Sequence, residues 1–263
     1  MIFSFSPIYF WFFFIASLSL LSYPSVSTAQ SEIKSLLSKL DNNYYYPQKK
    51  GLTNISAQLT WEQQDTSSEK IIFIKKPVFQ IKGKLINHIF LKKIISNAEG
   101  RRISDDKNTE YTNFLKNYLD AFIPKTLYEK FSNHEGQVRH QKKNKIILKL
   151  TDKISAAKAK EYELLIDTEK WQISKIHIRQ NQEPRSIEGK FFYTRRGDQW
   201  VVAETLSEFT VNNQTYIEKT EYTYKNLQNF WLVKKIKQTV KQDGHLIRSY
   251  RIQLNDYKVN IEN

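Results

Sequence analysis

The chain has no cysteine, and glycine is scarce. Its 263 residues include no Cys and seven Gly. Without cysteine there is no disulfide, thiolate metal site, cysteine nucleophile or lipid-modified N-terminal cysteine. The glycines, at positions 51, 83, 100, 136, 189, 197 and 244, are never closer than eight residues. Dinucleotide-binding folds, P-loop ATPases and Gly-x-Ser-x-Gly esterases all need closer glycines, so these function classes are excluded.

Charge is missing from the N-terminal stretch, although the chain as a whole is basic. Residues 1–29 carry no charged side chain, whereas the full chain has 41 Lys+Arg, 27 Asp+Glu and a net charge of +14. The apolar run 10–21 precedes Pro24 and the small residues Ser27 and Ala29. This pattern predicts a signal peptide, 1–29, cleaved after Ala29. A span beginning near Ile2 leaves an uncleaved membrane anchor as the alternative.

Two segments have the periodicity of amphipathic helices. The first follows Ser31, with apolar residues at positions 33, 36, 37 and 40. The second follows Asp105 and continues one apolar stripe from Tyr111 to Phe122, until Pro124 stops it. Residues 30–263 contain no linker, so we expect a single domain with a helical insertion at about 86–131.

Most of the remaining chain alternates with a period of two. Three two-residue turns, Gly197-Asp198, Asn212-Asn213 and Asp243-Gly244, separate β-rich runs of about ten to fifteen residues. Long antiparallel strands curl. The expected fold class is therefore mainly β with α (α+β): a strongly curved antiparallel sheet, or unclosed half-barrel, with lid helices on its concave side.

Residues that carry chemistry are scattered. The five histidines have no compact metal-ligand spacing, so we expect no metal and no cofactor. Among the carboxylates, Glu204, Glu208, Glu218 and Glu221 fall on neighbouring predicted strands. A pair of them could act as acid and base, but cross-strand salt bridges with Lys219, Lys234 or Lys235 are the favoured interpretation. We therefore predict no catalytic residue.

The basic residues are spread along the chain as doublets. They do not form a single basic arm or recognition helix. Such a distribution favours weak attraction to polyanions, including an anionic membrane surface. Because the chain carries an export signal, we do not expect nucleic acid as a partner.

Several stretches resemble a known family. The run 165–176, Leu-Ile-Asp-Thr-Glu-Lys-Trp-Gln-Ile-Ser-Lys-Ile, is similar to the recurring strand–turn–strand of the bacterial outer-membrane lipoprotein carriers (the Lol-type, LolA/LolB-like superfamily). The run 230–236 resembles their aromatic-Leu-Pro-x-x-Ile strand opening, with Val233 in place of Pro. The order of elements, ending in the strand 250–260, also resembles that family.

The resemblance implies a periplasmic, non-enzymatic carrier. Its unclosed barrel would shelter the acyl chains of a lipid or lipoprotein in an apolar cavity. Because the family's membrane-anchored acceptor uses a lipidated cysteine, which is absent here, the soluble-carrier side fits better. We expect a monomer.

Alternation suggests which side chains would line the cavity. The candidates are Leu59, Trp61, Phe79, Ile81, Leu115, Leu119, Phe122, Ile166, Phe191, Tyr193, Val202, Leu206 and Ile252. A filled core would have the same pattern. The alternative is therefore a cell-envelope binding or scaffold protein with a packed core, which recognises protein or an anionic polymer. A hydrolase on the same scaffold is a third hypothesis.

Overall fold

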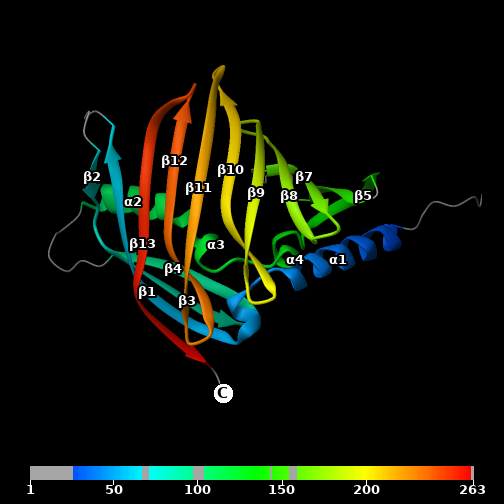
Figure 1. The fold of residues 1–263 in the computed structure, drawn as a ribbon, viewed down its shortest axis with the longest axis horizontal. Helices are drawn as coiled ribbons and strands as arrows, with labels where there is room; N and C mark the ends of the chain where they lie inside the picture. Colours follow the sequence, from blue (N-terminus) through cyan, green and yellow to red (C-terminus); the bar gives the residue numbers. More distant parts are fainter. Residues whose placement is uncertain (1–25, 67–70, 97–103, 143, 154–158, 262–263) are drawn as a thin grey trace, which may run out of the picture.

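One large antiparallel sheet dominates the structure, a computed structural model that describes residues 26–66, 71–96, 104–142, 144–153 and 159–261 (Figure 1). Its 13 strands are β1 (Leu52–Asp65), β2 (Ile72–Lys75), β3 (Phe79–Ile86), β4 (Ile89–Ser96), β5 (His134–Lys142), β6 (Lys145–Asp152), β7 (Ala159–Asp167), β8 (Gln172–Gln180), β9 (Ser186–Arg196), β10 (Gln199–Val211), β11 (Gln214–Leu227), β12 (Phe230–Gln242) and β13 (His245–Ile261). The helices are α1 (Val26–Asn43), a 3₁₀ turn (Pro47–Lys50), α2 (Asp105–Lys116), α3 (Leu119–Phe122) and α4 (Leu127–Lys130).

The sheet is a meander that the N-terminal strands extend. Strands β5 to β13 pair in chain order, then β13 pairs with β1, β1 with β3 and β3 with β4, while β2 pairs with β1. Within the described part of the chain the two edge strands, β4 and β5, do not pair, so the curved sheet is unclosed. The mainly β class and the curved, unclosed antiparallel sheet are thus confirmed. Since α2, α3 and α4 lie between β4 and β5 in the chain, the helical segment links the two sheet edges.

The three predicted hairpin turns are confirmed, and two more exist. Positive φ angles occur at Gly197 (63°), at Asn212 and Asn213 (49° and 62°) and at Asp243 and Gly244 (46° and 88°). Equivalent turns at Asn87-His88 and Gln228-Asn229 also have positive φ at both residues. The first of these joins β3 to β4, so the front of the region 86–131, where we expected helix, is a strand. Its alternating residues pair with β3, and among the described residues of this region the helices lie within 105–130.

Both predicted helices differ in extent from the expectation. Helix α1 begins at Val26 rather than after Ser31, so it runs across the predicted cleavage point after Ala29. The rest of the predicted signal peptide, residues 1–25, lies outside the described residues. The second helix divides into α2 and α3, because the amides of Asn117 and Tyr118 bond the carbonyls three residues back, which tightens the chain there.

Apolar packing is divided among three clusters. One joins α2 and α3 to β1, β3, β12 and β13, and includes Trp61, Phe79 and Leu115. A second packs α1 on β6, β7 and β8 around Leu40 and Leu164. A third, smaller cluster surrounds Leu52. No helix within the described ranges is long and apolar enough to cross a membrane.

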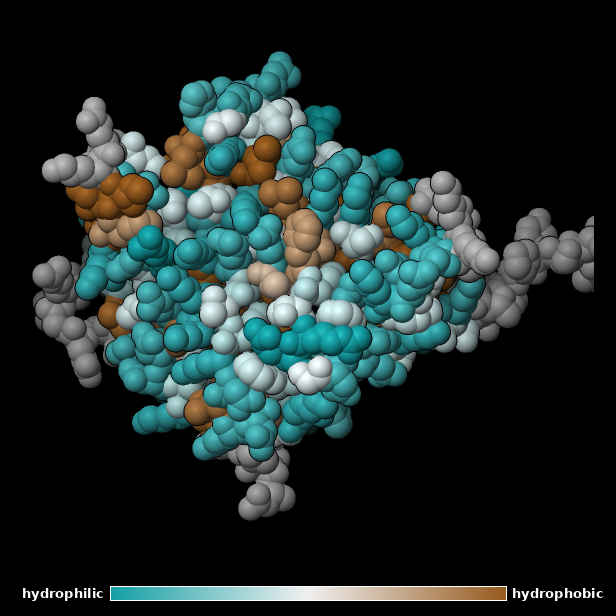
Figure 2. All heavy atoms as spheres, in the orientation of Figure 1, coloured by the Kyte–Doolittle hydropathy of each residue, from teal (hydrophilic) through white to brown (hydrophobic). Residues whose placement is uncertain are grey.

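The face of the molecule seen in Figure 2 is mostly hydrophilic. Lys190, Leu206 and Lys219 occupy one cross-strand row on β9, β10 and β11. The neighbouring row on one side consists of Glu188, Glu208 and Ile217, and the row on the other side consists of Phe192, Glu204 and Glu221. The opposite face of the same strands contributes to the second cluster and to the cavity described next.

Candidate functional site: a cavity between the helices and the sheet

A cavity of about 400 Å³ lies between the helical segment and the sheet. The first wall is the segment 117–131, which includes α3 and α4. The second is the loop 44–47 after α1, and the third is the inner face of β7 to β12. Apolar and aromatic side chains predominate, and they include Phe122, Phe131, Leu164, Ile173, Ile176, Phe191, Tyr193, Trp200, Val202, Tyr222, Tyr224, Trp231 and Val233. This is the composition expected of a site for an apolar ligand.

Tyrosine hydroxyls inside the cavity bond to backbone or to one another. The Tyr193 hydroxyl donates to the carbonyl of Ile173 at 2.8 Å, and the amide of Ile173 donates to the Tyr44 hydroxyl at 2.7 Å. The Tyr44 hydroxyl then donates to that of Tyr193 at 3.2 Å, and the two rings stack with centroids 5.5 Å apart. Burial raises the pKa of Tyr44 to about 12 and that of Tyr193 well above its ordinary value. Both hydroxyls therefore stay neutral and partnered.

Asp41 ties two walls of the cavity together. Its carboxylate is 2% exposed. It accepts hydrogen bonds from the Tyr46 hydroxyl at 2.5 Å, from the amide of Leu127 at 2.8 Å and from the amide of Tyr128 at 3.0 Å. The end of α1, the tyrosine loop and the start of α4 are thus held by one buried anion, whose charge is offset by three donors.

Charged side chains also belong to the helical wall. Asp120, Lys125 and Lys130 contribute to the lining, and all three are exposed or partly exposed. Asp120 pairs with Lys92 of β4 at 2.5 Å, and the same ammonium donates to the carbonyl of Ile123 at 2.8 Å. Lys92 thereby fixes α3 to the edge of the sheet.

The predicted cavity residues separate into three groups. Phe122, Phe191, Tyr193 and Val202 line the cavity. Eight others lie in or against the packed clusters instead: Leu59, Trp61, Phe79, Ile81, Leu115, Leu119 and Ile252 in the first, and Ile166 in the second. There, the same alternation builds core rather than cavity wall.

Leu206 lies on the other face of the sheet. Alternation assigns it to the side of Val202, but Ala203 is an extra residue in β10. Val202 pairs with Tyr193, whereas Leu206 pairs with Lys190 on β9 and Lys219 on β11. A one-residue bulge exchanges the two faces of every residue that follows it.

The carboxylates of the meander also divide between the faces. Lys219 bridges Glu204 at 3.0 Å and Glu221 at 3.4 Å, as the salt-bridge interpretation predicts. Glu218 points to the inner face, where burial raises the pKa of its carboxyl, while a hydrogen bond with Gln238 lowers it. Gln238 also accepts from the Tyr118 hydroxyl of the helical segment at 2.6 Å. Within the described ranges, no three acidic or histidine side chains could hold a metal ion.

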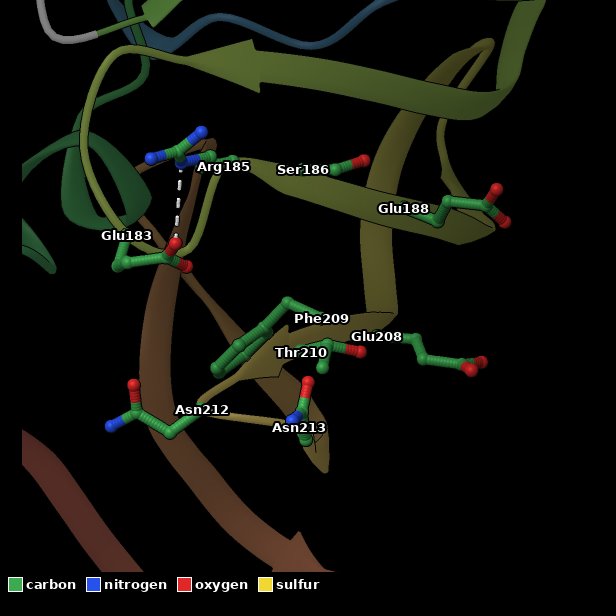
Figure 3. A pocket seen from close by; sticks show the side chains of 9 residues that line it. All are labelled: Glu183, Arg185, Ser186, Glu188, Glu208, Phe209, Thr210, Asn212 and Asn213. Carbon is green, nitrogen blue, oxygen red and sulfur yellow. Dashed lines mark ion pairs between the residues drawn. The ribbon is translucent and has the colours of Figure 1, made fainter.

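A second hollow, of about 660 Å³, lies beside the β10–β11 turn and the loop before β9 (Figure 3). Its lining is mostly polar: Glu183, Arg185, Ser186, Glu188, Glu208, Phe209, Thr210, Asn212 and Asn213. Glu183 pairs with Arg185 at 3.3 Å, and in Figure 3 Glu188 and Glu208 point away from that pair. The hollow lacks a buried apolar wall, so it suits an acyl chain less well than the cavity.

Several lining residues were missed at the sequence level. The run Tyr44-Tyr45-Tyr46 was a visible signal, because three consecutive aromatic residues match neither helical nor strand alternation. The Tyr45 hydroxyl accepts from the amide of Trp231 at 2.9 Å, which joins this loop to β12. Trp200 and Trp231 could not be separated from ordinary strand aromatics without the register.

Comparison with known proteins identifies similar structures only. No family model matches the chain, and no curated protein matches it. It is similar to a DUF1329 family protein from Desulfovibrio piger, with 9% identity, a TM-score of 0.39 and coverage of 89% of this chain and 95% of that one. A LolA superfamily protein from Nitrosomonas europaea has 8% identity, a TM-score of 0.33 and coverage of 89% and 94%. A domain assigned to outer-membrane lipoprotein sorting, from Vibrio parahaemolyticus, has 7% identity, a TM-score of 0.37 and coverage of 89% and 93%. Identities below 10% and TM-scores below 0.4 carry no conclusion about the ligand of this chain.

Proposed function

We propose that the protein is an exported, periplasmic, non-enzymatic carrier or binder that shelters an acyl chain of a lipid or lipoprotein in the cavity. The observation that carries this proposal is the cavity of about 400 Å³, whose inner tyrosine hydroxyls are already partnered. These partnered tyrosine hydroxyls leave no unmet hydrogen bond for an aliphatic tail to desolvate in the inner part of the cavity. Each CH₂ group removed from water contributes about 0.8 kcal/mol.

The helical segment is suited to act as a lid in this proposal. Residues 117–131 form one wall, and they link the two edges of the sheet. Polar contacts hold this segment at four places: Lys92 to Asp120 and Ile123, Gln48 to Pro124, Tyr118 to Gln238, and Asp41 to α4. Its buried side chains Phe122, Ile123 and Phe131 also pack in the apolar clusters and would have to leave them on opening. Opening this wall would expose the cavity while the sheet stays paired.

A carrier must exchange its ligand with a membrane, and one surface is suited to an anionic bilayer. Ile86, Ile89 and Leu91, at the β3–β4 turn, are 43%, 57% and 55% exposed. The segment 71–96 contains six Lys and no Asp or Glu. A separate exposed group, Ile71, Ile72 and Ile74, lies near β2 at the opposite end of β1 from the β3–β4 turn, where Figure 2 shows hydrophobic atoms at one margin of the molecule. Apolar side chains among lysines favour contact with anionic head groups.

A matched pair of variants on β10 tests the cavity. Val202→Trp would fill it, whereas Leu206→Trp adds the same ring on the opposite face. We expect the first variant to abolish uptake of a fluorescent fatty-acid probe and the second to retain it. Thr205→Phe, which fills the same cavity from a half-buried position, replaces Val202→Trp if that chain fails to fold. Equal probe uptake by the filled and control variants would refute the proposal, because the probe would then bind outside the cavity. A native chain that takes up no probe would favour an envelope scaffold with a packed core.

One observation favours hydrolysis as a second candidate function. Glu218 is a half-buried carboxyl with a raised pKa on the inner face, which is a property of many general acids. Hydrolysis of a chromogenic ester or glycoside by the native chain, lost in Glu218→Gln, would support it. No turnover by the native chain would leave the carrier proposal in place.

A further inference from the structure

The two lysines of the cavity wall indicate the head group of the ligand. Lys125 precedes the N-cap of α4 and Lys130 is its last residue, and both contribute to the cavity lining. In the described part of the chain neither ammonium makes an ion pair or a hydrogen bond, and the Lys130 ammonium lies 5.7 and 6.0 Å from the ring centroids of Phe131 and Tyr162. Two cationic groups with unused donors thus lie at the edge of an apolar space.

The neighbouring carboxylates are already engaged elsewhere. Asp120 pairs with Lys92. Glu129 accepts from the amide of Thr126 at 2.8 Å and from its hydroxyl at 3.0 Å, which completes the capping box of α4. Asp41 is buried under its three donors. Among the described residues no carboxylate forms an ion pair with Lys125 or Lys130, and Asp120, whose charge acts on Lys130, is shared with Lys92.

Lys130 belongs to the lining of the cavity. The residue is exposed to solvent, and desolvation by the nearby protein lowers the pKa of its ammonium. Asp120 raises that pKa and the charge of Lys125 lowers it, so the two lysines are close enough to repel each other. An anion between them would relieve the repulsion and gain charge-assisted hydrogen bonds.

The interior is suited to a tail. Beyond the lysines the lining is Phe122, Leu164, Val202 and other apolar groups, and the tyrosine hydroxyls are occupied. A volume of about 400 Å³ lies near the lower end of the range for small-molecule sites. It suits one chain better than two or three.

We infer that the cavity binds a single-chain amphiphile with an anionic head group, and that Lys125 and Lys130 hold the head while the chain occupies the apolar interior. This inference rests on the proposed function. It specifies the ligand, because an acyl carrier without the lysine site would accept neutral and cationic heads equally.

Four probes with the same chain test the head group: dodecanoate, dodecyl phosphate, dodecyl maltoside and dodecyltrimethylammonium. Displacement of a fluorescent fatty-acid probe from the full chain, below the micellar concentration, gives each affinity. We expect both anions to bind at least about tenfold more tightly than the other two, from two charge-assisted contacts. A preference for dodecanoate over dodecyl phosphate would indicate a free fatty acid, and the reverse a lysophospholipid.

Charge variants locate the site. Lys125→Gln and Lys130→Gln should each weaken dodecanoate about tenfold and leave dodecyl maltoside unchanged. The control is Lys107→Gln, an exposed lysine in the first turn of α2 that does not contribute to the cavity lining. Unfolding midpoints within experimental error of the native chain show that each variant is folded.

The outcomes separate the two levels of the proposal. If none of the four probes binds, the carrier function fails and the inference fails with it. If dodecyl maltoside binds as tightly as dodecanoate, or if both lysine variants keep the native preference, the lysine site is refuted while the carrier function stands. A two-chain phospholipid such as dilauroylphosphatidylglycerol that binds more tightly than dodecyl phosphate would refute the single-chain assignment.

Discussion

Replacing Asp41 should loosen the helical side of the cavity more than any surface substitution. The carboxylate is 2% exposed and accepts three hydrogen bonds, from Tyr46, Leu127 and Tyr128. In Asp41→Ala the buried Tyr46 hydroxyl and the part-buried amides of Leu127 and Tyr128 lose their acceptor. Each unsatisfied buried group costs about 1–3 kcal/mol, so the free energy of unfolding should fall by about 3–5 kcal/mol. For a chain of this length that loss corresponds to a decrease in Tm of roughly 10 °C.

Equilibrium unfolding in urea, followed by tryptophan fluorescence, measures this loss. Asp41→Asn keeps one acceptor oxygen and should lose about half as much. Tyr46→Phe, combined with Asp41→Ala in a double-mutant cycle, should have a coupling energy of about 1–3 kcal/mol. The control is Glu110→Ala, on the exposed side of α2, which should change stability by less than about 0.5 kcal/mol. A loss below about 1 kcal/mol in Asp41→Ala would refute the reasoning.

Three further substitutions test the packing and the buried charges. Burial lowers the pKa of His134 in the folded chain, so below about pH 6.5 the unfolded chain binds the proton more readily than the folded one. The free energy of unfolding should therefore fall on acidification. Urea unfolding at pH 7.5 and 5.5 measures this change, and His134→Gln should remove the part that is due to His134. Burial raises the pKa of Glu218, so ionisation of this carboxyl opposes folding as the pH rises above about 4.5. Glu218→Gln should therefore raise Tm at pH 7 but not at pH 4. The control Glu221→Gln, on the outer face, should not raise Tm at either pH. A Cβ at Gly136 would lie 2.7 Å from the Lys149 carbonyl oxygen and 3.0 Å from Ile33 Cδ1 of α1. Gly136→Ala should therefore lower the free energy of unfolding by about 1–3 kcal/mol, seen as a lower Tm in a thermal melt. An unchanged Tm would contradict the close approach of α1 to β5.

Local signals made much of the sheet predictable from the sequence. Turns such as Asn212-Asn213 need positive φ, which Asn and Gly adopt at little cost, and this requirement located three of the hairpins. The turn Gln228-Asn229 uses the same geometry, but Gln gives no comparable signal. Turn chemistry therefore located strand ends where the residue types allowed only one conformation.

The face of a residue along a long strand could not be predicted with the same success. Alternation is local, and each bulge reverses it for the residues beyond. Val202 and Leu206 illustrate this, because Ala203 lies between them. A cavity lining and a packed core also share one pattern: Trp61 and Phe191 are equally good sequence candidates, yet the first lies in the cluster under α2 and the second faces the cavity. Which of the two arises depends on how far the helical segment lies from each strand.

The bulges and the tyrosines of this sheet are two parts of one arrangement. The Tyr224 hydroxyl donates to the carbonyl of Val202 at 2.8 Å, beside the bulge in β10. That of Tyr257 donates to the carbonyl of Val233 at 2.6 Å, beside the irregularity between β11 and β12. Ile173 lies where β7 and β8 shift register, and both of its backbone groups bond to tyrosine hydroxyls: its amide donates to Tyr44 and its carbonyl accepts from Tyr193.

A bulge bends a strand and interrupts the ladder, so a nearby backbone group needs another partner. A tyrosine on the inner face can supply that partner and still present an apolar ring to the interior. The curvature that makes room for the cavity and the neutral, partnered hydroxyls that keep its wall apolar thus have a common origin. This is why tyrosine, rather than phenylalanine alone, lines the space in which we propose that the acyl chain binds.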